Sequence, residues 1–156
     1  MKSPISEYAP AQPSTHYWIE AERQLRIEEY RGEVMLEDLR SMATAITSDP
    51  AWSPYYHALM DFTAANLILG TNEAMRLGLM FRQESYQSTG WLVFAAGNST
   101  NFGNIRMLGR WSKNLDRFRI FDTRRDAESW INRNACTHPF RAPTTPLPGA
   151  SQRISA

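Results

Sequence analysis

The chain has little cysteine and no long hydrophobic run. Cys136 is the single cysteine among 156 residues, which excludes a framework of internal disulfide bonds and suits a reducing compartment, so we expect a cytoplasmic protein. No apolar stretch approaches the about 20 residues that a membrane-spanning helix needs, and residues 1–15 lack the apolar core of a secretory signal. The net charge is +1, from 17 basic and 16 acidic residues, and this balance argues against a nucleic-acid partner.

The residue types that build metal and catalytic sites are scarce as well. The three histidines, His16, His57 and His138, are widely separated in the sequence, and the single cysteine has no partner at metal-binding spacing. Residues 97–103 look like a phosphate-binding loop, but the Gly-Lys-Ser/Thr ending and the glycine spacing of nucleotide-binding motifs are missing. We interpret them as a strand-to-helix turn, and we predict no catalytic residue, no metal and no cofactor.

Proline is concentrated at the two ends of the chain. Residues 1–15 and 137–156 are rich in Pro, Ser, Thr and Ala and have no hydrophobic period. Proline cannot occupy the interior of a helix or of a central strand, and such segments bury too little apolar surface to fold. We therefore predict a disordered N-terminal tail (1–15), one folded domain (16–136) and a disordered Pro-rich C-terminal tail (137–156).

Within the predicted domain, the hydrophobic period switches repeatedly between that of strands and that of helices. The predicted strands are 17–22, 25–30, 57–62, 91–96 and 118–121. The predicted helices are 36–48, 72–85, one that opens at Ser99 or Thr100, and one that is capped by Thr123. The order β-β-α-β-α-β-α-β-α predicts a single α/β domain, in which a mixed five-stranded sheet has four helices and the first two strands form an antiparallel edge hairpin.

Several segments of this pattern resemble those of the SpoIIAA-like family. They are YRGEVMLEDL (30–39), DPAW (49–52), ALMDF (58–62), GNIRML (103–108) and FRIFDTRRDAESWI (118–131). This family comprises small, mostly uncharacterised bacterial proteins with the fold of the STAS domain, which is the fold of anti-sigma-factor antagonists. The resemblance implies a non-enzymatic regulatory or ligand-binding module, with lipid-like ligands or membrane association suggested for some members.

The sequence departs from the kinase-switched STAS regulators at one point. Those regulators have a serine in an Asp-Ser-Ser-Gly-like turn, whereas the matching residues 67–72 contain no serine. Thr71 is either a simple helix N-cap or a residue whose phosphate the helix N-terminus would favour. The candidate anion or phosphate positions at the two helix N-termini are Thr71, Asn72, Ser99 and Thr100.

Two features of the predicted surface are not explained by packing of the core: additional apolar residues on the helices and an uneven distribution of charge. The helices carry additional apolar residues beside their inward stripes, namely Met75, Leu79, Tyr86, Met107 and Trp111. These residues serve either second-layer packing and a homodimer contact or a ligand groove and membrane-facing patch. Charge is also uneven, with a balance of −5 over 17–66 and +4 over 67–134. The basic stripe of Arg106, Arg110 and Lys113 is either a solvated face or a site for an anionic head group or an acidic protein surface.

Two classes of function remain. The favoured one is a non-enzymatic regulatory or binding module that acts as a homodimer, through a regulatory protein partner, an apolar or lipid ligand, or a membrane surface. Its binding residues would be Met75, Leu79, Met107, Trp111, Arg106 and Arg110. The alternative is an enzyme whose site lies at the ends of strands three and four, around Asp61, Thr63, Asn98 and Ser99.

Overall fold

The computed structural model describes residues 14–83, 86, 88–112 and 115–135. The strands are β1 (Ser14–Glu20), β2 (Leu25–Val34), β3 (His57–Leu67), β4 (Leu92–Ala95) and β5 (Phe118–Phe121). The α-helices are α1 (Leu36–Thr47), α2 (Thr71–Met80), α3 (Ser99–Ser112) and α4 (Arg124–Asn134), with short 3-10 turns η1 (Ala21–Arg23) and η3 (Leu115–Arg117). The predicted order of strands and helices and the mixed α/β fold are confirmed.

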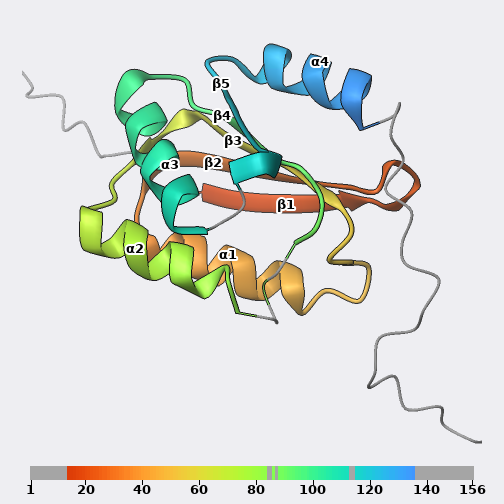
Figure 1. The fold of residues 1–156 in the computed structure, drawn as a ribbon, viewed down its shortest axis with the longest axis horizontal. Helices are drawn as coiled ribbons and strands as arrows, with labels where there is room; N and C mark the ends of the chain where they lie inside the picture. Colours follow the sequence, from red (N-terminus) through yellow and green to blue (C-terminus); the bar gives the residue numbers. More distant parts are fainter. Residues whose placement is uncertain (1–13, 84–85, 87, 113–114, 136–156) are drawn as a thin grey trace, which may run out of the picture.

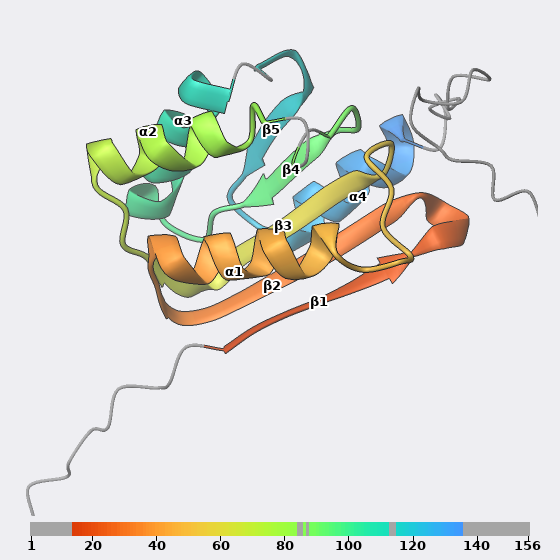
Figure 2. The ribbon, with the colours of Figure 1, turned by 90° about the horizontal axis from the view of Figure 1, so that it is seen from below.

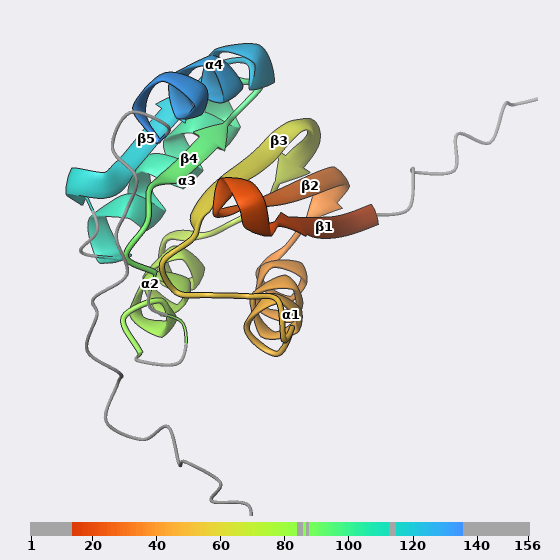
Figure 3. The same cartoon turned by 90° about the vertical axis from the view of Figure 1, so that its right-hand side faces the viewer.

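The five strands lie in the sheet in the order in which they occur along the chain, β1-β2-β3-β4-β5. β1 is antiparallel to β2, as the predicted hairpin requires, and all the other neighbours are parallel. Figures 1 and 2 show α1, α2 and α3 on one face of the sheet, and Figure 3 shows α4 on the opposite face. Because both faces are covered by helices, the sheet has two hydrophobic cores rather than one.

Two strands extend beyond their predicted ends. β2 continues to Val34 through Gly32, whose φ of 75° is one that glycine adopts readily, and β3 continues to Leu67 instead of ending at residue 62. The parallel ladder between them shifts register between Glu29 and Arg31 and then runs on to the end of both strands. The prediction stopped at these points because a bulge interrupts the simple alternation of side chains.

The N-terminal boundary of the folded part also differs from the prediction. β1 begins at Ser14, which pairs with Arg31, so Ser14 and Thr15 belong to the sheet and not to a tail. The rest of the predicted tails, Cys136, His138 and Lys113 lie outside the described residues.

The caps of two helices were assigned to the wrong residues. Thr71 is the first residue of α2, and the preceding Gly70 is the N-cap, whose N–H donates to Glu73 Oε2 at 2.8 Å. At α3, Asn98 Oδ1 accepts the N–H of Asn101 at 2.8 Å, so Asn98 is the cap in place of Ser99 or Thr100. The predicted cap of α4 is confirmed, because Thr123 Oγ1 accepts the N–H of Asp126 at 3.1 Å.

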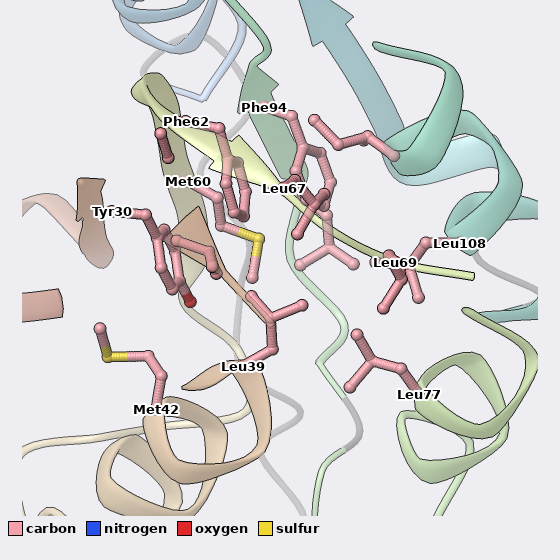
Figure 4. Packing of buried hydrophobic residues seen from close by; sticks show 14 of the residues in the cluster. Tyr30, Leu39, Met42, Met60, Phe62, Leu67, Leu69, Leu77, Phe94 and Leu108 are labelled. Atoms are coloured by element: carbon pink, nitrogen blue, oxygen red, sulfur yellow. The ribbon is translucent and has the colours of Figure 1, made fainter. Parts of the chain in front are cut away.

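The larger core lies between the sheet and the three helices α1, α2 and α3. Tyr30 and Phe62 stack there with ring centroids 4.4 Å apart, beside buried leucines from α1, α2 and α3 (Figure 4). α2 and α3 approach closely at Gly78, where an added Cβ would lie 2.4 Å from the Cβ of Trp111. This contact holds the two helices together as one layer over the sheet.

A buried asparagine joins α3 to two strands of the sheet. Asn101 is fully buried, and its Nδ2 donates to the carbonyl oxygens of Phe62, Ala65 and Ala96 at 3.2, 2.9 and 2.8 Å. Its Oδ1 accepts the N–H of Leu67 at 2.9 Å. The side chain therefore pairs backbone groups where β3 and β4 approach their carboxyl ends, which fixes the start of α3 against the sheet.

Candidate functional site

A groove of about 370 Å³ lies between α1 and α2. Its walls are formed by Leu36, Arg40, Arg76, Leu77, Leu79, Met80, Gln83 and Tyr86. Leu36 and Arg40 are one turn apart on α1, and Arg76 and Met80 are one turn apart on α2, so each helix contributes an apolar and a basic side chain. This spacing gives the groove an apolar floor and a basic rim.

The two arginines of this groove are weakly engaged within the protein. Arg40 is 3.7 Å from Glu37 in a pair whose side chains are both exposed, and no described residue forms an ion pair with Arg76. Exposed pairs of this kind contribute little to stability. Leu79 lines the same groove and is 43% exposed, so it presents apolar surface to solvent there. The groove therefore offers positive charge and apolar surface together.

The structure places the predicted apolar binding residues in two locations. Leu79 lines the groove. Met75, Met107 and Trp111 lie outside its lining; Trp111 is 37% exposed at the contact between α2 and α3. We name the set Met75, Leu79, Met107 and Trp111 the seam patch.

The predicted basic and anion-binding residues lie elsewhere on the helices. Arg106 and Arg110 are exposed on α3 and do not line the groove. The candidate phosphate positions Thr71, Asn72, Ser99 and Thr100 are exposed in the first turns of α2 and α3.

A cluster of charged side chains surrounds Arg124 on the α4 face of the sheet. Arg124 Nη1 donates to Glu29 and, at 3.2 Å, to Asp61 Oδ2, while Arg124 Nε donates to Glu128 Oε1 at 2.9 Å. His16 Nε2 lies 2.9 Å from Glu29 Oε2. The hydrogen bond from Arg124 lowers the pKa of Glu29. Burial opposes the charged form of Arg124, but the hydrogen bonds with Glu29 and Glu128 outweigh it, so that the pKa of Arg124 is raised.

Three of the four side chains of the alternative enzymatic site, those of Asp61, Thr63 and Asn98, have structural partners, and Ser99 is exposed at the start of α3. Asp61 Oδ1 accepts the N–H and the hydroxyl of Thr63 at 2.9 and 2.7 Å, its Oδ2 faces Arg124, and Asn98 caps α3. Asp61 thus accepts hydrogen bonds from a nearby residue, which is a common structural role for a lone acid. The charged cluster ties β1, β2, β3 and α4 together.

Sequence reasoning missed a second polar cluster, which is buried beneath α1. Arg26 Nε donates to Glu28 Oε1 at 2.8 Å, and the Tyr30 hydroxyl donates to Glu28 Oε2 at 2.6 Å. Burial, and then the charge of Glu28, raise the pKa of Tyr30 well above its ordinary value. The sequence predicted residues 25–30 as part of an antiparallel edge hairpin, and its polar residues were not singled out. β2 lies inside the sheet, however, so that both of its faces are covered.

These elements define an α/β protein with a SpoIIAA-like fold. A similar solved structure is that of an uncharacterised protein of the DUF3478 family with a SpoIIAA-like fold, from Shewanella loihica PV-4. It is 18% identical in sequence, and the match covers 79% of this chain and 98% of that chain with a TM-score of 0.51. No family model and no curated protein matches the sequence. Among the described residues, no helix is long and apolar enough to cross a membrane.

Proposed function

We propose that the protein is a non-enzymatic binding module that holds an anionic amphiphile of the fatty-acid type in the groove between α1 and α2. The observation that carries this proposal is the combination of Arg40 and Arg76 with apolar side chains around one hollow of about 370 Å³.

The dimensions and chemistry of the groove support this ligand class. Sites for small molecules usually measure about 300–1,000 Å³, and this groove of about 370 Å³ combines apolar side chains with basic and polar ones. Leu36, Leu79 and Met80 provide surface for a hydrocarbon chain, and every buried CH₂ group contributes about 0.8 kcal/mol. The guanidinium groups of Arg40 and Arg76 can each donate two parallel hydrogen bonds to a carboxylate.

Direct titration with dodecanoate tests the proposal. The variant Arg40→Glu/Arg76→Glu should bind dodecanoate at least about tenfold more weakly than the natural protein, because a basic rim becomes acidic. The matched control, Arg106→Glu/Arg110→Glu, changes the net charge equally but on α3 outside the groove, and its affinity should stay within about twofold. If both variants bind dodecanoate equally weakly, the loss of affinity comes from long-range electrostatics and not from contacts in the groove. If the natural protein does not bind dodecanoate, the proposed ligand class is refuted.

A further inference from the structure

A pocket lies beside α4, on the face of the sheet opposite to the groove. Neighbouring strands are about 4.8 Å apart, so that five strands span about 19 Å, whereas a helix with its side chains is about 10–12 Å wide. One helix therefore leaves part of this face uncovered, and α4 packs mainly on β3, β4 and β5. Figure 3 shows β1 and β2 at the end of the sheet away from α4. The pocket measures about 140 Å³ and lies between α4, β2, β3 and the η1 turn.

The floor of this pocket is aliphatic. It is formed by Leu25 and Ile27 of β2, Leu59 of β3 and Ile131 of α4, each of which is at most 4% exposed. Ile27 and Leu59 are direct partners in the parallel ladder, so they present adjacent side chains to α4. An apolar cavity of about 150 Å³ holds one benzene molecule, and this pocket therefore has room for an apolar body of about that size.

The rim of the pocket is polar. Arg23 Nη2 donates to Asn132 Oδ1 at 2.7 Å, which joins η1 to α4 at the solvent side of the pocket. Arg23 Nη1 donates to Glu20 Oε2 at 2.7 Å, so that one carboxylate balances this arginine. Glu128 also lines the pocket, one helical turn before Asn132. Its Oε1 accepts from Arg124, no described residue donates to its Oε2, and its side chain is 46% exposed, so this oxygen is accessible to a ligand.

The charge beside Glu128 is only partly balanced within the protein. Arg124 pairs with three carboxylates, those of Glu29, Asp61 and Glu128. The other basic side chains of this cluster, Arg31 and His16, contact Glu29 and are more than half exposed to solvent. Glu128 therefore shares its arginine with two other acids, and a cation beside its second oxygen is electrostatically favoured.

We propose that this pocket binds a small primary amine in its protonated form, with the ammonium group beside Glu128 and an apolar body of about one six-membered ring over the aliphatic floor. The ammonium group donates one hydrogen bond to Glu128 Oε2 and the others to solvent at the open side. A carboxylate in the same place would meet the charge of Glu128, while Arg23 already has its partner in Glu20. This preference is opposite to that proposed for the groove, and the pocket does not depend on the groove being a binding site.

Titration with benzylamine, benzyl alcohol and benzoate tests this site, because the three molecules share a ring and differ in charge at neutral pH. NMR of leucine and isoleucine methyl groups follows binding, since the ring of a bound molecule shifts nearby methyl signals. The signals of Leu59 and Ile131 should shift with benzylamine, while that of Leu79, which lies in the groove, serves as the reference. Benzylamine should bind at least about tenfold more tightly than either of the other two. Equal affinities, tighter binding of benzoate, or no shift of Leu59 and Ile131 would overturn the proposal.

Two matched variants test the role of Glu128. Glu128→Gln removes the charge and keeps the shape of the side chain, so it should bind benzylamine at least about fivefold more weakly and benzyl alcohol within about twofold of the natural protein. Glu29→Gln removes the same charge from the same arginine, but residue 29 does not line the pocket, and its affinity for benzylamine should stay within about twofold.

Equal losses of affinity in both variants would overturn the direct contact with Glu128, and an unchanged affinity in Glu128→Gln would overturn the assignment of the ammonium site. Should Glu128→Gln not fold, the comparison of the three molecules on the natural protein still decides the question.

Discussion

Asn101 shows how much of the fold can depend on one polar side chain. It is fully buried, accepts one backbone N–H and donates to three backbone carbonyls, two within β3 and one directly after β4. Nothing in the sequence distinguished it from the other polar residues of 97–103, because its role depends on contacts with residues 34 to 39 positions away. A polar residue that satisfies distant backbone groups has no local pattern by which to recognise it.

We expect Asn101→Ala to lower the free energy of unfolding by about 3 kcal/mol or more, because several buried backbone groups lose their partners at once. Asn101→Asp should lower the free energy of unfolding further than Asn101→Ala does, because a carboxylate would face three carbonyl oxygens. The control is Asn104→Ala, which removes one hydrogen bond of 2.8 Å to Leu67 O from a half-buried side chain and should lower it by about 1 kcal/mol. Urea unfolding of the three variants measures the differences, and equal values for Asn101→Ala and Asn104→Ala would contradict this role.

The charged cluster predicts how stability depends on pH. The pKa of Glu29 is lowered in the folded protein by the hydrogen bond and charge of Arg124 and by the charge of His16, which outweigh burial and the opposing charge of Asp61. Arg31 lies 3.8 Å from the same carboxylate, and Glu128 faces Arg124 from α4. A lowered folded-state pKa means that the stabilisation is present above the ordinary pKa of 4.5 and is lost as the pH falls through the folded-state value.

Glu29→Gln should therefore be less stable than the natural protein at pH 7, and the difference should shrink as the pH falls below about 4.5. Denaturant unfolding of both proteins between neutral pH and about pH 3 measures this convergence. A difference that stays constant across the range would show that the Glu29 carboxylate contributes through packing and not through its charge.

At the scale of helices, the contact between α2 and α3 depends on a glycine. A Cβ at Gly78 would lie 2.4 Å from the Cβ of Trp111 and 3.0 Å from its carbonyl carbon, so the helices would have to separate. We expect Gly78→Ala to lower the free energy of unfolding by about 1–3 kcal/mol. Gly103→Ala is the control, because nothing lies within 4 Å of that position on α3, and it should raise stability by about 0.5–1 kcal/mol. Thermal unfolding reports both, and a neutral Gly78→Ala would mean that the helices adapt without cost.

The strands and helices were predictable where local pattern determines them, and not where pairing does. β5 was predicted with the bounds that it has, and the cap residue Thr123 located the start of α4. The second halves of β2 and β3 were missed because they are defined by their ladder with each other after a bulge. The Arg26 cluster was missed because alternation alone does not tell a covered face from an exposed one.

For the molecule as a whole, the candidate sites come from elements far apart in the sequence. The groove joins α1 to α2, and the Arg124 cluster joins the first two strands to the last helix. The sequence singled out two groove residues, Leu79 and Tyr86, through their unexpected apolar character. Arg40 and Arg76 were not singled out, because each is an ordinary helical arginine until α1 and α2 lie side by side (Figure 2).

We predict that the whole protein self-associates through the seam patch. Trp111 is 37% exposed and Leu79 43% exposed, and apolar side chains of this size are buried when two copies meet. We expect native mass spectrometry to find a homodimer, and Trp111→Ala to shift it toward monomer while unfolding stays cooperative, because the side chain is already partly in solvent. Met35→Ala removes a similarly exposed side chain, 53% accessible, at the start of α1 and should leave the dimer intact. A natural protein that is monomeric, or a dimer that Trp111→Ala leaves unchanged, would show that the seam patch only packs α2 against α3.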